Sequence, residues 1–292
     1  MQKGPSRRPR PRPRNGSLVV VGTGVAPVVQ ATLETVELIT RADKLFYLVT
    51  DSLTEFWLKD LNASAETLAD LYGEQVDRER TYAAMATRIT SAVRRGASVC
   101  AAFYGHPGVF VEASHRAIEE LQEDGYRARM VPAVSSDACL YADLGVDPGM
   151  CGVQSFEATD FLLRRRRFDS TSVLLLWQVG ALGEKTAVRG SCKPERLATL
   201  TRHLLRSYPP RHPVVVYRAG QFPGQGPSIR SVRLETLPRT DVSPAETLYV
   251  PPLRQRQSDP RILKWLDGPA RPIVRTRPAP GIRRSALLDA ST

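Results

Sequence analysis

The sequence lacks the marks of a membrane-spanning, secreted or zinc-binding protein. No uncharged apolar run among its 292 residues approaches the length needed to span a bilayer, and the basic N-terminus leads into no apolar segment of a signal peptide. The four cysteines (Cys100, Cys139, Cys151 and Cys192) form no CxxC pair, and the four histidines add no metal-ligand spacing. We therefore expect a cytoplasmic protein with free thiols, no metal and no membrane partner.

Acidic residues are absent from the first 16 positions, which hold six lysines and arginines, and are scarce after position 252. These two basic ends account for the whole net charge of +11 and leave residues 17–252 close to neutral. Their composition predicts a disordered basic tail over 1–16 and, within 253–292, a short helix followed by a Pro/Arg-rich tail. Such tails are either merely solvated or hold an acidic partner, and we expect no specific nucleic-acid binding.

Residues 17–145 alternate short apolar strands with amphipathic helices. The β-branched run Ser17 to Val21 is typical of a buried strand, and a glycine turn and a helical pattern follow it. The same rhythm predicts further strands at 44–49, 98–103 and 128–131, and helices at 81–95, 112–123 and 135–141. This alternation predicts a doubly wound α/β N-terminal subdomain built on a parallel sheet.

Residues 146–252 predict a C-terminal subdomain of mixed α/β structure. One clear helix is expected at 194–208, and strands are expected at 154–163, 172–177, 213–218, 228–234 and 246–250. These strands indicate a mixed, largely antiparallel sheet. The arginine run 164–167 is either a solvated chain segment or a surface that steers an acidic peptide.

Glycine or serine loops follow several of the predicted strands. They are Gly22-Thr23-Gly24, Gly105-His106-Pro107-Gly108, 131–136 and 177–180. In open α/β sheets, ligands bind at the carboxyl ends of the strands, where glycines let the backbone approach a ligand closely. The loops therefore predict a cofactor site, with Asp51 as a candidate for holding a ribose and His106 as either a base or a residue that shapes the cleft.

In this order the loops resemble those of the tetrapyrrole methylases, the class III S-adenosylmethionine (SAM) methyltransferases. The resemblance implies the tetrapyrrole-methylase fold, with SAM bound in a cleft between the two subdomains. It also implies the cofactor-binding residues, which we expect to be Gly22, Gly24, Tyr104, His106, Val109, Phe110, Ser135, Ser136, Gln178 and Val179.

A narrower resemblance covers roughly residues 16–267. The segments 16–24, 103–110, 114–117, 142–144 and 178–180, with Asp147-Pro148 and Glu157-Ala158, are similar to the borosin peptide backbone α-N-methyltransferases. Enzymes of that family methylate amide nitrogens of a peptide that is either their own C-terminus or a separate precursor. The resemblance also implies an interlocked homodimer.

Amide methylation has demanding chemistry, because the nitrogen lone pair is delocalised into the carbonyl. The N–H proton must be removed and charge on the oxygen stabilised. A tyrosine beside an arginine suits both needs, since the guanidinium lowers the phenol pKa and can hydrogen-bond an oxyanion. Tyr72, Arg78 and Tyr82 stand at the spacing of the borosin catalytic set, and the resemblance makes them, with Tyr104, the expected catalytic residues.

Two alternatives accompany this assignment. Arg78 and Tyr82 share one face only if a helix has begun by position 78, and Arg80 is the alternative arginine. Otherwise the segment is an ordinary charged start of a helix with half-buried tyrosines.

The C-terminal sequence bears on the substrate. Residues 269–292 are rich in proline and arginine, and proline has no N–H to methylate. We therefore expect the substrate to be a separate ribosomal precursor peptide, as in the biosynthesis of a ribosomally synthesized and post-translationally modified peptide (RiPP). Two other functions stay open: a methyltransferase of the same fold that acts on a tetrapyrrole or corrin, and a non-catalytic SAM-binding partner module.

Overall fold

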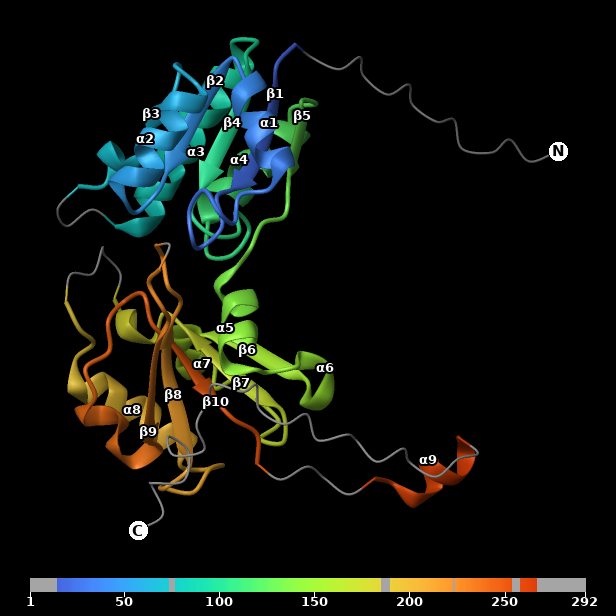
Figure 1. The fold of residues 1–292 in the computed structure, drawn as a ribbon, viewed down its shortest axis with the longest axis vertical. Helices are drawn as coiled ribbons and strands as arrows, with labels where there is room; N and C mark the ends of the chain where they lie inside the picture. Colours follow the sequence, from blue (N-terminus) through green and yellow to red (C-terminus); the bar gives the residue numbers. More distant parts are fainter. Residues whose placement is uncertain (1–14, 74–76, 185–189, 223, 254–257, 267–292) are drawn as a thin grey trace. The chain divides into compact units, whose positions relative to one another are not determined.

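The computed structural model describes residues 15–73, 77–184, 190–222, 224–253 and 258–266 (Figure 1). Most of the two predicted tails lies outside these residues. The chain forms two compact units, of which the first runs to Ser136 and includes the segment Gln221–Gln225, and the second begins at Asp137. Each unit has its own five-stranded sheet. No described helix is long and apolar enough to cross a membrane.

The first unit is a doubly wound α/β structure, as the sequence predicts. Its sheet has the order β3-β2-β4-β1-β5, and all neighbouring strands are parallel. The strands are β1 (Ser17–Gly22), β2 (Lys44–Leu48), β3 (Glu66–Thr67), β4 (Ser98–Phe103) and β5 (Arg127–Met130). The helices are α1 (Leu33–Arg41), α2 (Ser52–Leu61), the single turn η1 (Ala69–Leu71), α3 (Arg78–Arg94) and α4 (Glu112–Glu123).

Successive residues of the strands enter two different cores, because side chains alternate between the faces of a sheet. In β4, Ala101 packs in the core that contains Ile89 of α3, whereas its neighbour Cys100 packs with Leu58 of α2 on the other face. All four side chains are fully buried. The strands are thus covered on both sides, which explains their continuous apolar runs.

Helix α2 was not expected from the sequence. Its N-terminus is capped by Asp51, whose carboxylate accepts hydrogen bonds from the Thr54 backbone N–H at 2.8 Å and the Thr54 hydroxyl at 2.6 Å. These bonds engage both carboxylate oxygens. Asp51 therefore acts as a helix cap, which favours this structural role over the interpretation of Asp51 as a ribose ligand.

The second unit contains the mixed sheet, with the order β6-β7-β10-β8-β9. Strands β6 and β7 are parallel, and the other three pairs are antiparallel. The strands are β6 (Val153–Glu157), β7 (Val173–Trp177), β8 (Pro213–Arg218), β9 (Ser228–Arg233) and β10 (Thr247–Val250). The helices are α5 (Ser136–Leu144), α6 (Pro148–Cys151), α7 (Ala158–Leu163), η2 (Val179–Ala181), α8 (Pro194–Leu204), η3 (Leu234–Arg239) and α9 (Pro260–Trp265).

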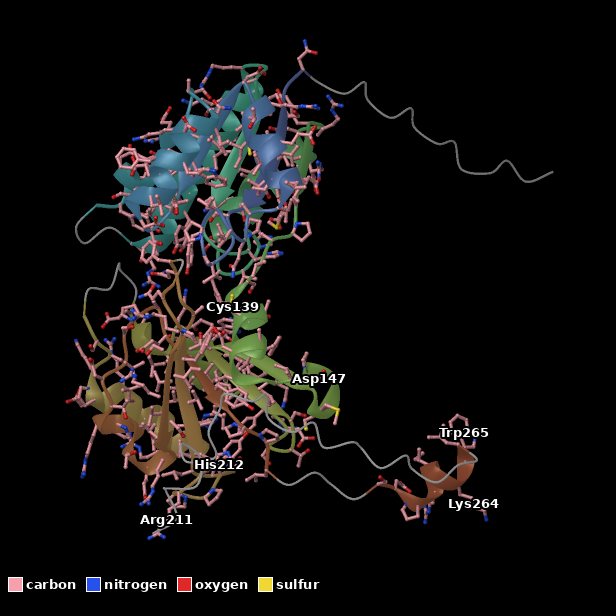
Figure 2. The ribbon with its side chains drawn as sticks, viewed as in Figure 1. Cys139, Asp147, Arg211, His212, Lys264 and Trp265 are labelled. Carbon is pink, nitrogen blue, oxygen red and sulfur yellow. The ribbon has the colours of Figure 1, made fainter. Side chains whose placement is uncertain are left out.

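One core, formed with α7, α8 and η3, packs against this sheet. Near its edge, the ring of Tyr208 stacks on Phe168 and on His212, which Figure 2 labels. The ring centroids are 5.9 Å and 4.7 Å apart, respectively. The His212 Nε2 also lies 2.9 Å from the Pro251 carbonyl oxygen, so His212 ties this aromatic stack to the chain that follows β10.

The predicted strand over 154–163 is wrong in its second half. The chain is extended only to Glu157, whose carboxylate accepts a hydrogen bond from the Asp160 N–H at 2.6 Å and so begins helix α7. Ala158 and Phe161 then lie one helical turn apart and are both fully buried. A short apolar run of this kind fits either a strand or a helix, and the cap decides between them.

Candidate active site

The candidate site of the first unit lies at the carboxyl edge of its parallel sheet. The last residues of β1 and β2, Gly22 and Leu48, are both in register with Phe103, the last residue of β4. The chain leaves all three strands at the same level. The loops that the sequence singled out after β1 and β4 therefore begin side by side.

Backbone hydrogen bonds hold these two loops together. The Thr23 N–H donates to the Phe103 carbonyl at 2.9 Å. Gly24 and Gly105 form a reciprocal bridge, in which the Gly105 N–H donates to the Gly24 carbonyl at 2.9 Å and the Gly24 N–H donates back at 3.3 Å. The two expected cofactor loops thus form one rigid backbone unit.

Gly22 is the point where three loops converge. A Cβ atom at Gly22 would clash with the Gly105 carbonyl oxygen and would lie 2.6 Å from the Ala133 Cβ and 2.7 Å from the Pro107 Cδ. Gly105 has a φ of +68°, and a Cβ built there meets no atom within 4 Å. The bare backbone at Gly105 faces open space, as expected where a cofactor approaches the main chain.

His106 is bound within its own loop. Its Nδ1 accepts a hydrogen bond from the Gly108 N–H at 3.0 Å, so a neutral ring carries its proton on Nε2. His115 on α4 approaches the same loop, with its Nε2 3.0 Å from the Gly108 carbonyl oxygen. These contacts favour the interpretation of His106 as a residue that shapes the loop over its interpretation as a base.

Val109 and Phe110 expose apolar surface next to the glycine loop. Their side chains are 37% and 44% exposed, respectively, and Phe110 has a φ of +57°, which is unusual for a bulky residue. Binding sites for organic ligands are mostly lined by such apolar groups. The pair is therefore suited to contact a nucleoside, as the sequence predicts.

The remaining expected cofactor residues lie after β5 and β7. Ser135 is largely buried and directly precedes α5, which begins at Ser136. In the second unit, Gln178 follows β7 in a left-handed conformation with φ +54°, and Val179 is fully buried in the core. The cofactor roles of these four residues stay predictions.

The structure brings Tyr72, Arg78 and Tyr82 together. Tyr72 directly follows η1, and α3 begins at Arg78, with the Asp77 carboxylate capping the helix by accepting from the Glu79 N–H at 2.8 Å. Arg78 and Tyr82 are both helical and four residues apart, which places them on one face. Arg78 and Tyr82 are half-buried, whereas Arg80 is exposed. The placement favours Arg78 over Arg80.

The electrostatics of this group differ from the sequence-based expectation. The pKa of Tyr72 is raised from 10.0 to about 12, first because its phenol is desolvated and then because of the charge of Tyr82 and a side-chain hydrogen bond with Tyr82. Arg78 lowers the pKa, as predicted, but its effect is outweighed. The Tyr72 side chain is 39% exposed, so screening by water moderates the shift. Tyr72 therefore keeps its proton at neutral pH.

Tyr104 lies in the β4 loop and has a partner that the sequence did not reveal. Its backbone N–H donates to the Leu48 carbonyl at 3.1 Å, and its hydroxyl accepts a hydrogen bond from the Gln221 Nε2 at 3.0 Å. Gln221 belongs to the segment Gln221–Gln225, which packs as part of the first unit. In the sequence, Gln221 is a polar residue in a glycine-rich connection, and no local pattern identifies Tyr104 as its partner.

The fold occurs in several solved methyltransferases. Uroporphyrin-III C-methyltransferase from Thermus thermophilus aligns with a TM-score of 0.58 and 20% sequence identity, over 81% of this chain and 92% of that one. Diphthine synthase aligns with a TM-score of 0.56 and 17% identity, over 82% and 91%. At such identities the likeness is one of fold alone.

Relatives in fungi are much more similar in sequence. The methyltransferase/ribosomally synthesized cyclic peptide gymnopeptides precursor of Gymnopus fusipes and the omphalotin A precursor of Omphalotus olearius are each 37% identical over 256 residues. The match covers 86% of this chain but 61% of each relative, so the chain spans about three fifths of their length. A type III borosin precursor of Anomoporia bombycina is 36% identical over 83% of this chain and 29% of its own length.

A family model described as Tetrapyrrole (Corrin/Porphyrin) Methylases matches residues 17–234, which include both sheets except β10. The match includes the glycine loops described above, and also Tyr72, Tyr82 and Tyr104. With this match and the paired glycine loops at one edge of a parallel sheet, the chain belongs to the tetrapyrrole methylase family, whose methyltransferases use SAM as the cofactor.

Proposed function

We propose that this protein transfers methyl groups from SAM to backbone amide nitrogens of a ribosomal precursor peptide supplied as a separate chain. The grouping of Tyr72, Arg78 and Tyr82 is the observation that carries the proposal. It is supported by the printed names of the fungal relatives, which combine a methyltransferase with a cyclic peptide precursor.

The residues at the sheet edge fit the cofactor. Gly105 leaves the backbone bare toward open space, and Val109 and Phe110 offer apolar surface for the adenosyl group. SAM, when bound, supplies an electrophilic methyl group on a sulfonium, which needs no metal for activation. These residues hold and orient it.

Tyr82 is the proposed acceptor of the amide proton. Burial of the phenol, followed by the contact with Tyr82, raises the pKa of Tyr72 and keeps the proton on Tyr72. Tyr72 is thus a hydrogen-bond donor, and its bond to Tyr82 supports Tyr82 when Tyr82 is ionised. A proton that leaves the substrate nitrogen is then taken by Tyr82, the member of the pair that lies on α3.

Arg78 is the proposed stabiliser of charge on the substrate. As the amide loses its proton, negative charge develops on the carbonyl oxygen, and a fixed guanidinium stabilises such charge. Arg78 is the first residue of α3 and shares a face with Tyr82, so one helix presents both the base and the cation. Tyr104, held by Gln221, is proposed to orient the peptide.

Residues 269–292 are rich in arginine and in proline, which has no N–H to methylate, so these residues are poor candidates for backbone methylation. We also propose an interlocked homodimer, on the resemblance to borosin enzymes. Light scattering of the purified protein tests the oligomeric state.

Co-expression tests the function. The protein is produced with a small peptide encoded beside it, and both chains are analysed by mass spectrometry. Methyl increments on the peptide and none on residues 269–292 are expected. Increments on the protein's own tail would contradict the in-trans proposal, and a methylated tetrapyrrole with an unmodified peptide would contradict the peptide substrate.

A further inference from the structure

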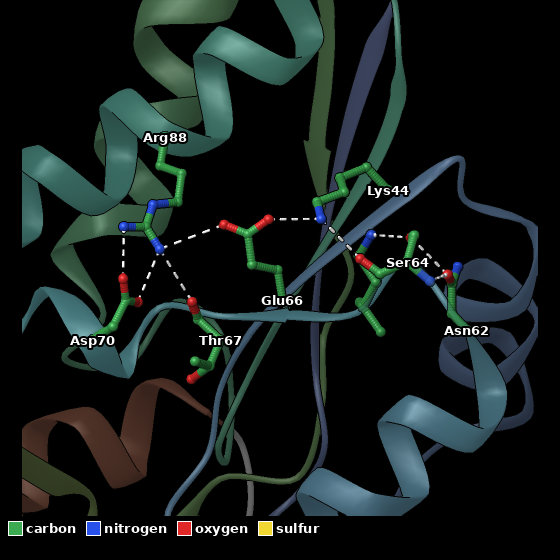
Figure 3. A network of polar contacts seen from close by, with 8 residues as sticks. Lys44, Asn62, Ser64, Glu66, Thr67, Asp70 and Arg88 are labelled. Carbon is green, nitrogen blue, oxygen red and sulfur yellow. Dashed lines mark hydrogen bonds and ion pairs between the residues drawn. The ribbon is translucent and has the colours of Figure 1, made fainter.

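Tyr72 is connected to helix α3 by an ion pair two residues before it. The Asp70 carboxylate, in η1, receives two parallel hydrogen bonds from Arg88 of α3 (Figure 3). Both donor–acceptor distances are 2.8 Å, from Nη1 to Oδ1 and from Nη2 to Oδ2. Such bidentate pairs fix orientation as well as distance. They also lower the pKa of Asp70, so the carboxylate stays charged.

Arg88 is itself held by the neighbouring edge strand. Its Nη1 donates to the Thr67 carbonyl at 3.2 Å, and Nη1 lies 3.5 Å from the Glu66 carboxylate. Glu66 in turn pairs with Lys44 at 2.7 Å, and Lys44 donates to the Ser64 carbonyl at 2.9 Å. Figure 3 shows this chain of contacts, which joins β2, β3, η1 and α3. The Arg88 side chain is 27% exposed, so it is partly shielded from water.

The turn that carries Tyr72 is fixed in part by apolar packing, since Leu68 is fully buried and Leu71 packs against the core that contains Met85 and Ile89 of α3. η1 is a single turn of three residues, and the Tyr72 N–H donates only to the Ala69 carbonyl, at 3.1 Å, within that same turn. Among the described residues, the side chain of Asp70 gives this turn its polar connection to α3. The same helix carries Arg78 and Tyr82, the two residues that Tyr72 must face.

We infer that Arg88 is a positioning residue which, through Asp70, holds Tyr72 against Tyr82 and Arg78. Arg88 touches neither substrate nor cofactor in this role. It sets the distance between two phenols that belong to different elements. The inference rests on the proposed function, in which these phenols carry the reaction.

A matched pair on the same helix provides the control. Arg94, near the end of α3, donates to the Asp124 carboxylate from Nε at 2.9 Å and from Nη2 at 2.7 Å. Arg94 has no part in the proposed site. Arg88→Gln and Arg94→Gln therefore each remove one Arg–Asp pair from α3, and only the first releases the turn that carries Tyr72.

The kinetic test compares methyl transfer to the precursor peptide. We expect Arg88→Gln to lower kcat by up to about 100-fold, the loss typical of a displaced catalytic group, with KM for SAM unchanged. Asp70→Asn should behave alike, and the double variant should be no worse than either single one, because all three break the same link. Arg94→Gln should keep wild-type kcat. Equal kcat values for Arg88→Gln and Arg94→Gln would overturn the inference.

A second readout does not depend on activity. With 3-fluorotyrosine in place of tyrosine, the ¹⁹F signal of Tyr72 is assigned by its loss in Tyr72→Phe, and its pKa is followed by titration. Release of the turn exposes Tyr72 and separates it from Tyr82, so Arg88→Gln should lower this pKa toward its ordinary value. Loss of the Arg88 charge alone would raise the pKa of Tyr72, so the direction of the change separates release of the turn from loss of the charge.

The outcomes distinguish the two proposals. If the wild-type protein methylates no peptide but Arg88→Gln lowers the pKa of Tyr72 and Arg94→Gln does not, the positioning role stands and the proposed function fails. If the pKa of Tyr72 is the same in Arg88→Gln and the wild type, the positioning role is wrong whatever the activity.

Discussion

The phenols of Tyr72 and Tyr82 are hydrogen-bonded, and burial together with this contact raises the pKa of Tyr72 to about 12. Tyr72 therefore keeps its proton at neutral pH. On this ground we propose Tyr72 as the hydrogen-bond donor of the pair and Tyr82 as the base.

Substitution of the two tyrosines should separate these roles. Tyr82→Phe removes the proposed base and should lower the single-turnover rate of methyl transfer by about 100- to 10,000-fold. Tyr72→Phe removes a hydrogen bond to a charged group, worth about 1.5–3 kcal/mol, and should cost roughly 10- to 100-fold. A larger loss in Tyr72→Phe than in Tyr82→Phe would reverse the assignment. SAM binding by calorimetry should be unchanged in both.

The two arginines at the start of α3 should differ in the same assay. Arg78→Ala removes the cation proposed to stabilise charge on the substrate oxygen, with an expected loss of about 100- to 1,000-fold in kcat. Arg80 is exposed, so Arg80→Ala should keep nearly full activity. Full activity of Arg78→Ala would remove it from the proposed site. Circular dichroism of both variants controls for folding.

Alanine substitutions at two glycines should separate an effect on SAM binding from an effect on stability. Gly105 and Gly96 both have positive φ, of +68° and +100°, and a Cβ meets no atom within 4 Å at either position. Gly105→Ala and Gly96→Ala should therefore share a backbone cost of about 1 kcal/mol in the free energy of unfolding. Only Gly105→Ala should weaken SAM binding in calorimetry, because its methyl group enters the proposed cofactor space.

Gly22 should respond differently. A Cβ there clashes with the Gly105 carbonyl oxygen and meets two further loops, so Gly22→Ala should lower the thermal unfolding midpoint markedly. A Gly22→Ala protein as stable as the wild type would show that the three loops do not converge as described.

Substitution of Tyr208, which lies away from the site, should change the free energy of unfolding. Its hydroxyl is buried and has no hydrogen-bond partner among the described residues. Removal of such a group should raise stability, so we expect Tyr208→Phe to gain about 1–2 kcal/mol in the free energy of unfolding. Tyr217→Phe is the control, because the Tyr217 hydroxyl donates to the Asp143 carboxylate at 2.7 Å. That variant should lose stability in the same denaturant titration.

The alkaline stability of the protein should also depend on Tyr208. Burial, with the charge of Asp169, raises the pKa of Tyr208 from 10.0 to about 12. The unfolded chain therefore releases this proton first, so stability is complete below pH about 10 and falls as the pH rises toward about 12. Tyr208→Phe should show a shallower fall in thermal midpoint over this range. An unchanged fall would contradict the raised pKa.

The sequence predicted the elements whose patterns are unambiguous. Strand β4 and helix α4 have the predicted bounds, because a buried apolar run and a strong three- and four-residue spacing each fit one structure. Around Glu157 the same reasoning failed, since the side chain that ends the strand also caps a helix. Helix α2 was missed for the same physical reason, because the side chain of Asp51 caps it shortly after a predicted strand.

The site was predictable only in its residue types. The spacing of Arg78 and Tyr82 follows from helical geometry, but the proximity of Tyr72 depends on how η1 packs beside α3. Gln221 is 117 positions from Tyr104, and no local pattern connects them. The raised pKa of Tyr72 depends on burial and on Tyr82, which the sequence alone does not supply.

One measurement tests the central claim most directly. The purified protein is incubated with SAM and the candidate precursor peptide, and fragment ions from tandem mass spectrometry locate each added methyl group. The proposal predicts methyl groups on backbone nitrogens in the reaction with the wild-type protein and almost none with Tyr82→Phe. Methyl groups on side chains alone, or an unmodified peptide in the presence of bound SAM, would contradict it.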